Sequence, residues 1–244
     1  MGLSAGDMDD YPDYLSLESP LATPREEAQI HELRGLIGDA LLEPPHRDFP
    51  EVVGDIALLR YLRGRDHDVV DAARVFRAHL DLRKQHGLDE MRTRIAKLGD
   101  RWDKYTAHDF TDGAAILKRM PWVYNAGLSP HGHVITYIPV GVQDSRTLWS
   151  EVGLERYMRF SMEEWIARDI QLDRLSREKG RLIKLILIID LTGLSLTSSQ
   201  VTFSGKKQYD RDWQAILETK PETTIRWYRL VPLNSPYPTE LKTP

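Results

Sequence analysis

The sequence predicts an α/β fold, in which a helical N-terminal module precedes a mostly parallel β-sheet with crossover helices. Three observations predict it: amphipathic helical periodicity before residue 100, a nearly continuous aliphatic run at 182–191, and strand-like segments at 133–140 and 224–231 separated by helical patterns. Strands that alternate with helices favour parallel pairing through right-handed crossovers.

The order of these patterns divides the chain into four parts. We expect a disordered leader at 1–22, a helical module at 23–99, an α/β part at 100–231 and an irregular tail at 232–244. The tail, VPLNSPYPTELKTP after residue 230, is rich in proline, which leaves little room for regular structure.

A capping signature opens the first predicted helix. Thr23 can cap the helix, Pro24 suits its first position, and Glu26 stands where a capping box needs a carboxylate. The helical pattern runs through Leu42 and is stopped by the Pro44-Pro45 pair.

The segment 55–89 predicts a hairpin of two amphipathic helices. Asp55 and Asp68 are the predicted N-caps; Gly64 is expected to close the first helix in a left-handed conformation, and Gly87 to end the second. Apolar residues of the second helix recur at spacings of three and four and so share one stripe: Val69, Ala72, Ala73, Phe76 and Leu80. Met91, Ile95 and Leu98 suggest a further short helix that ends at Gly99.

The first half of the α/β part combines a strand pattern with a long helix pattern. Residues 133–140, HVITYIPV, are rich in β-branched and aromatic side chains and predict a strand, with Pro139 at its end or on an edge. Residues 147–178 predict one long helix, which Gly180 ends. Residues 114–119 fit either a strand or a helical turn.

The aliphatic run LIKLILIIDL at 182–191 is the predicted centre of the sheet. Such a run is typical of a strand buried on both faces in a parallel sheet. Gly193 begins the predicted exit turn, a weaker helical pattern ends near Leu217, and residues 224–231 predict a third strand.

Composition excludes several classes of function. With 244 residues, 41% of them hydrophobic, the chain can form an ordinary core, and its net charge of −4 gives no general attraction to nucleic acid. The absence of cysteine excludes disulfides and thiolate metal sites, and it fits a cytoplasmic location. No secretory signal and no apolar run of membrane-spanning length is visible.

Four motifs resemble one family. They are LLRYLRGR at 58–65 with LRKQHGLD at 82–89, HGHVITYIPVG at 131–141, LILIIDLTGLSL at 185–196, and Lys220-Pro221-Glu222 before TIRWYRLV. Together they resemble the CRAL-TRIO lipid-binding proteins over roughly residues 28 to 230. The resemblance implies a non-enzymatic protein without cofactor or metal, which binds a phospholipid or other hydrophobic molecule and contacts membrane surfaces transiently. The family's gating helix has no counterpart after Val231, so the resemblance implies an incomplete CRAL-TRIO fold.

The resemblance also implies a head-group site. In transfer proteins of this family an arginine and a glutamate hold an inositol phosphate, and the matching positions are Arg65 and Glu222. A guanidinium binds two phosphate oxygens at once, and a carboxylate accepts hydrogen bonds from inositol hydroxyls. The plainer interpretation is that Arg65 pairs with Asp66 or Asp68 and that Glu222 is solvated.

A second head-group site, for choline, matches Leu185, Leu187 and Tyr124. Relatives carry serine and threonine where this chain has the two leucines, which cannot form hydrogen bonds through their side chains. The resemblance therefore favours an inositol lipid or another hydrophobic ligand over a phosphatidylcholine-like one.

Met158, Met162 and Trp165 follow one stripe of the predicted long helix. They could line a ligand cavity, although a stripe at helical spacing is more often plain core.

Enzyme and metal chemistry receive little support. Ser195 follows a strand, as a hydrolase nucleophile does, but the second glycine of G-x-S-x-G is missing. His131 and His133 form an H-x-H pair without a third ligand nearby in the sequence. The sequence thus predicts a cytoplasmic lipid carrier, with a protein-interaction or regulatory fragment as the alternative and an enzyme as a distant third.

Overall fold

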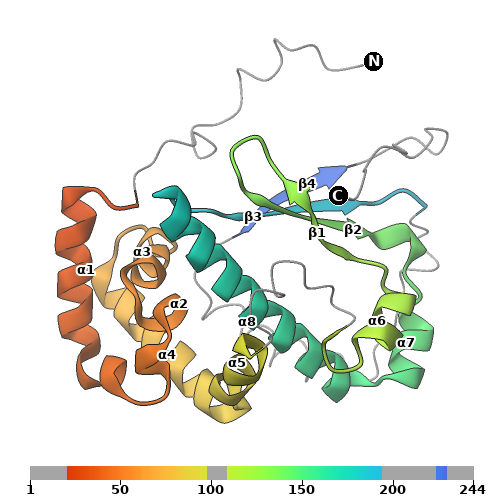
Figure 1. Cartoon of the computed structure of the whole chain (residues 1–244), viewed down its shortest axis with the longest axis horizontal. Coiled ribbons are helices and arrows are strands. Elements are labelled where there is room, and N and C mark those ends of the chain that lie inside the picture. The colour runs from red at the N-terminus through yellow and green to blue at the C-terminus, as the bar shows by residue number, and fades with distance from the viewer. Residues whose placement is uncertain (1–20, 98–108, 194–223, 230–244) are drawn as a thin grey trace, which may run out of the picture.

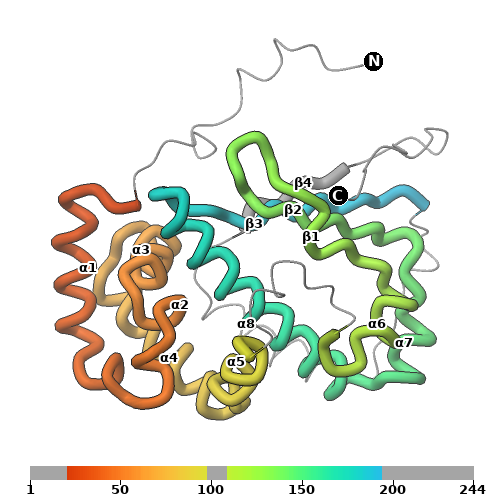
Figure 2. Tube along the Cα trace, viewed as in Figure 1, coloured from red at the N-terminus to blue at the C-terminus, as the bar shows by residue number. Residues whose placement is uncertain are grey.

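The computed structural model describes residues 21–97 and 109–193, together with the backbone of 224–229. Figure 1 shows a group of helices on one side, a β-sheet on the other, and one long helix, α8, running diagonally between them; Figure 2 traces the same path. The α/β class is confirmed. None of the helices in the described part combines the length and apolar character required to cross a bilayer.

The helical group occupies the first part of the chain. Its elements are α1 (Pro24–Ile37), η3 (Gly38–Leu42), η4 (His46–Asp48), α2 (Pro50–Val53), α3 (Asp55–Arg63), α4 (Val69–His86) and α5 (Leu88–Ala96). A core between α1, η3, α3 and α4 includes Leu33, Leu58, Leu62 and Phe76, all with almost no exposed surface. We call α1–α5 the helical module.

The capping box predicted for α1 is confirmed. The backbone N–H of Glu26 donates to Thr23 Oγ1, and the backbone N–H of Thr23 donates to Glu26 Oε2. Glu26 also accepts two hydrogen bonds from Arg63 of α3, at 2.7 and 3.0 Å. Chiefly through the Arg63 hydrogen bond, the pKa of Glu26 falls to about 2. The last predicted turn, to Leu42, is a 3₁₀ helix rather than α-helix.

The predicted hairpin forms, but two of its caps are wrong. Asp55 is the first residue inside α3, and its carboxylate pairs with Arg34 at 2.6 Å instead of capping. Gly54 is the N-cap residue instead, and glycine is needed there because a Cβ would lie 2.3 Å from the carbonyl oxygen of Pro50. Gly64 stays right-handed, while Asp66 and His67 adopt positive φ.

The second helix of the hairpin agrees with its prediction. Asp68 caps α4 by accepting from the backbone N–H of Asp71, and Gly87 ends it in the left-handed conformation. The predicted stripe lies inward: Val69, Ala72, Ala73 and Phe76 are buried and Leu80 packs against the same core.

The α/β part contains α6 (Gly113–Arg119), β1 (Val123–Leu128), β2 (Val134–Pro139), η7 (Val140–Val142), α7 (Ser145–Glu151), α8 (Leu154–Lys179), β3 (Leu185–Asp190) and β4 (Thr224–Arg229). Residues 114–119 are therefore helical. The single helix predicted over 147–178 is wrong, because Gly153, with φ of 78°, separates α7 from α8. Gly180 ends α8 as predicted.

The sheet has the strand order β1-β2-β3-β4. β2, β3 and β4 are parallel, as predicted, and β1 pairs antiparallel with β2. β1 was not predicted, although its alternation and the following Pro130-His131-Gly132 turn carry a hairpin signal. Pro139 ends β2 as expected.

The expected burial of β3 on both faces is wrong. Leu185 to Ile189 are all only half-buried, whereas Leu182 and Ile183, just before the strand, are buried. The reason is the diagonal course of α8, whose C-terminal half packs where β3 begins: Leu172 forms a cluster with Val134 and Ile183.

Candidate functional site: the sheet face under α8

Three of the predicted ligand-binding residues lie on one face of the sheet. Leu185 and Leu187 pair in register with Val134 and Thr136 of β2, both of which are buried. Side chains at paired positions point to the same side of a sheet. Tyr124 of β1 joins them: the Thr136 hydroxyl donates to its carbonyl oxygen at 2.7 Å, and its ring packs on Phe160 of α8. We call this surface the α8 face of the sheet.

The α8 face is apolar and only partly covered. At its β1 end the ring of Tyr124 packs edge-to-face on Phe160 of α8, with ring centroids 6.2 Å apart. Burial raises the pKa of Tyr124 well above its ordinary value. At its β3 end, Leu185 packs against the cluster around Leu172, while Leu187 stays half-buried. The face therefore retains accessible aliphatic surface on its central strand.

The opposite face carries a polar pair. The Tyr137 hydroxyl donates to Asp190 at 2.5 Å, and the backbone N–H of Thr192 donates to the other oxygen of that carboxylate at 2.9 Å. This pair fixes the C-terminal ends of β2 and β3 to each other.

Arg168 of α8 holds the helix to the sheet. Its guanidinium is buried and donates to the carbonyl oxygen of Tyr124 at 2.8 Å and to Thr136 Oγ1 at 3.3 Å. It also donates to Asn125 at 2.9 Å and Gln171 at 2.6 Å, and it lies 3.4 Å from the Glu164 carboxylate. The role of Arg168 was not predicted from the sequence. The available signal was its position, a charged residue among the buried residues Ala167 and Leu172 of the same helix.

Met158, Met162 and Trp165 do not lie on this face. Counted around α8 at 100° per residue, all three lie about 140–160° from Phe160, whose ring packs on Tyr124. Met162 and Trp165 instead line a small, mostly apolar pocket against α4 and α5, together with Leu82 and Leu88. The predicted ligand-lining residues therefore separate into two groups on different sides of α8.

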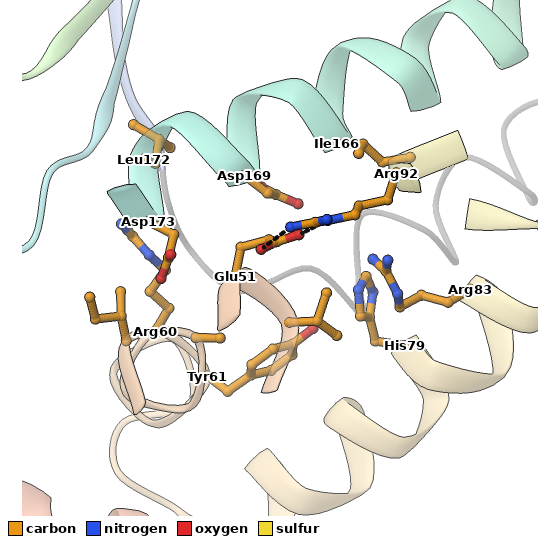
Figure 3. A pocket seen from close by; sticks show the side chains of 13 residues that line it. Glu51, Arg60, Tyr61, His79, Arg83, Arg92, Ile166, Asp169, Leu172 and Asp173 are labelled. Atoms are coloured by element: carbon orange, nitrogen blue, oxygen red, sulfur yellow. Dashed lines mark hydrogen bonds and ion pairs between the residues drawn. The ribbon is translucent and has the colours of Figure 1, made fainter. Parts of the chain in front are cut away.

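A polar pocket lies between the helical module and α8. Figure 3 shows the side chains that line it, among them Arg60 beside Asp173, Tyr61, and the Glu51–Arg92 ion pair, whose atoms are 2.6 Å apart. The enclosed space admits a few water molecules only. Tyr61 Oη and Arg60 Nη1 are buried in the described part of the chain without a hydrogen-bond partner.

This pocket is too small to hold a lipid, and its residues connect the helical module to α8 and to the approach to β3. The Arg60 guanidinium donates through Nη2 to Ser176 Oγ at 3.1 Å and to the carbonyl oxygen of Ile183 at 2.8 Å. It thereby ties α3 to the end of α8 and to the approach to β3. Burial lowers the pKa of Arg60 to about 10, so the side chain stays charged at neutral pH.

Asp173, which also lines this pocket, makes the stability of the fold depend on pH. Burial is the main cause that raises its pKa to about 6, Glu51 and Asp169 add to the rise, and Arg177 and Arg60 oppose it. Since the folded-state pKa exceeds the unfolded value of about 3.9, the proton that the folded state holds stabilises it below about pH 4. That contribution is lost as the pH rises through about 6.

We expect Asp173→Asn to remove this dependence. Between pH 4.5 and 7.5 the free energy of unfolding of the variant should rise by about 1–2 kcal/mol relative to the original chain, a value reduced for solvent screening. Urea unfolding at the two pH values measures it. Asp81→Asn, at an exposed position on α4, is the control. If the free energies of unfolding of the original chain and of Asp173→Asn change equally between the two pH values, the raised pKa of Asp173 is contradicted.

The proposed inositol-phosphate pair is only partly described. Arg65 follows α3, and its Nε lies 3.8 Å from a carboxylate oxygen of Asp71. Glu222 lies outside the described residues, as do Ser195 and the weaker helical pattern near Leu217. The Arg65 and Glu222 assignment stays a prediction.

The H-x-H pair has a structural use. His133 is buried, and its Nδ1 accepts a hydrogen bond from the backbone N–H of Lys184 at 3.1 Å. Burial, followed by nearby basic groups, lowers the pKa of His133 to about 4. Within 21–97 and 109–193, no three metal-ligating side chains come together.

No family model matches the amino-acid sequence, so the resemblance to CRAL-TRIO proteins rests on the quoted motifs alone.

Proposed function

We propose that the protein is a CRAL-TRIO-like carrier, which binds a phospholipid or another hydrophobic small molecule against the α8 face of the sheet. The observation that carries the proposal is the half-buried aliphatic row on the central strand, where Leu185 and Leu187 share a face with Tyr124. Central strands with a neighbour on each side are ordinarily well covered, and accessible apolar surface of this kind marks binding sites.

The chemistry of the face favours an apolar contact. Leu187 lies one strand away from Thr136, whose hydroxyl is engaged by the carbonyl oxygen of Tyr124 and by Arg168. The aliphatic side chains offer no hydrogen bond, so this surface suits acyl chains or rings, and any polar head group must be held elsewhere. Arg65 and Glu222 remain the proposed partners for an inositol phosphate.

Leu187→Thr is expected to weaken binding about five- to tenfold, because it removes apolar contact and places a hydroxyl against the ligand. Titration with pyrene-labelled phosphatidylinositol and phosphatidylcholine measures the change. The matched control is Ile188→Thr, the next residue of the same strand, which points to the opposite face. Equal losses in both variants would contradict the assignment to the α8 face.

Native mass spectrometry of the purified chain, combined with lipid extraction, tests the proposal more broadly. We expect a hydrophobic molecule to copurify in a defined ratio. Repeated recovery of protein without any such molecule, together with no uptake of either pyrene lipid, would overturn the carrier function and leave the protein-interaction alternative.

A further inference from the structure

The first helices of the chain pack around a core of their own. We call α1, η3, η4, α2, α3 and α4, residues 24–86, the α1–α4 unit. Among the residues that the structure describes, the buried core of this unit lies within 30–76, apart from Leu182. Ile95 of α5 belongs instead to the apolar cluster around the N-terminal half of α8. The boundary between the two cores therefore falls between α4 and α5, at Gly87.

Polar contacts join the α1–α4 unit to α5 and α8. Glu51 of α2 accepts from Arg92 of α5 at 2.6 and 3.2 Å, in the pocket that Figure 3 shows. Arg83 of α4 donates to Asp89 of α5 at 2.8 and 2.6 Å, and Arg60 of α3 donates to the end of α8. Polar interfaces of this kind resemble transient ones, because their charged groups regain hydration when the two sides separate.

The space between the α1–α4 unit and α8 is incompletely filled. The polar pocket and the small apolar pocket adjoin there, since both are lined by His79, Arg83, Ile166 and Asp169. On the α3 side, Tyr61 Oη and Arg60 Nη1 find no hydrogen-bond partner among the groups that the structure describes. Burying a polar group without a partner is unfavourable, so separation of the two sides relieves a cost that the closed arrangement carries.

Gly87 connects α4 to α5. It is the one residue between His86, the last of α4, and Leu88, the first of α5, and it has φ of 61° and ψ of 38°. Glycine enters and leaves this left-handed region without a steric penalty. α4 contains 18 residues. At 1.5 Å per residue it is about 27 Å long, so a rotation of about 10° at Gly87 moves its far end by roughly 5 Å.

We propose that the α1–α4 unit is a lid, which swings at Gly87 away from α5 and α8 and uncovers the apolar pocket of Met162 and Trp165. Leu82 of α4 forms part of one wall of that pocket, whereas Met162 and Trp165 belong to α8. Movement of α4 therefore opens the pocket while the α8 side stays in place. The lid does not depend on the carrier function, because its movement requires no lipid.

Asp89 holds the lid closed. It is the second residue of α5 and is buried; its carboxylate accepts from Arg83, and His46 Nδ1 lies 3.4 Å away. Asp89→Asn removes the charge and keeps the shape, so we expect it to raise the population of the open form about tenfold. Glu90→Gln removes the same charge at the next position of α5, which is exposed, and should leave the population unchanged.

Distances between two spin labels measure the open population in the full chain. The sequence contains no cysteine, so labels attach only to introduced ones. Val70→Cys/Glu155→Cys places labels at exposed positions of α4 and α8, and Val70→Cys/Glu32→Cys places both within the α1–α4 unit. Pulsed electron double resonance should show a displaced distance for the first pair that grows in Asp89→Asn, and one unchanged distance for the second pair.

Two results would overturn the lid. One is a distance for the first pair that is the same in the original chain, Asp89→Asn and Glu90→Gln. The other is a new distance for the pair within the α1–α4 unit, since the unit then unfolds instead of swinging. If Asp89→Asn does not fold, Glu51→Gln decides: it loosens the contact with Arg92, and it must enlarge the displaced population by itself.

Discussion

Replacing Arg168 by methionine is expected to lower the free energy of unfolding by about 3–5 kcal/mol, the usual cost of removing one partner from a buried charged network. The guanidinium satisfies the carbonyl oxygen of Tyr124, the side chains of Asn125 and Gln171, and the charge of Glu164, whose side chain is only 13% exposed. Methionine fills a similar volume but removes the buried donor that these acceptors share, and it removes the positive charge beside Glu164. For a chain of this length the midpoint of thermal unfolding should fall by roughly 10 °C.

Two further variants make the result specific. Arg168→Lys keeps the charge but not the planar fork that reaches β1 and β2 together, so an intermediate loss is expected. Arg25→Met, on the exposed side of α1, removes the same side chain where it is solvated and should change stability by less than about 0.5 kcal/mol. A loss below about 1 kcal/mol for Arg168→Met would show that the network does not hold α8 on the sheet.

Phe76→Ala is expected to destabilise the helical module by about 3–5 kcal/mol. Phe76 lies on the inward stripe of α4, has no exposed surface, and packs edge-to-face on Tyr61 with ring centroids 5.0 Å apart. Alanine leaves a cavity that neighbouring side chains from α1 and α3 cannot fill without moving the helices.

The same helix provides the control for Phe76. Val70→Ala, six residues earlier and 70% exposed, should cost less than about 0.5 kcal/mol. Urea unfolding followed by circular dichroism measures both variants. If Phe76→Ala unfolds within about 1 kcal/mol of the original chain, then α4 does not pack on the module core as described.

Several elements were predictable because their signals are local. The capping box at Thr23 and Glu26, the Asp68 cap and the left-handed Gly87 each depend on residues within a few positions of one another. The aliphatic run at 182–191 identified the central strand, and the helical patterns between strand patterns predicted the parallel pairing of β2, β3 and β4.

The errors had two sources, a contact with a distant part of the chain and local backbone conformation. The carboxylate of Asp55 could cap α3, but Arg34 of α1 binds it. Left-handed backbone was expected at Gly64 and occurs at Asp66 and His67, where the hairpin reverses. The apolar side chains at 147–178 continue the helical period across Gly153, so periodicity alone did not reveal the break there.

The sequence by itself determined the class of fold, the inward stripe of α4 and the central position of β3, since side-chain periodicity and capping act along the chain. Tertiary structure decided which side of α8 meets the sheet. It separated Met162 and Trp165 from Tyr124, Leu185 and Leu187, and it brought Arg168 between β1 and β2. The physical reason is that a helix with apolar residues around much of its circumference can pack in several orientations, and the buried hydrogen bonds from Arg168 to β1 and β2 favour the observed one.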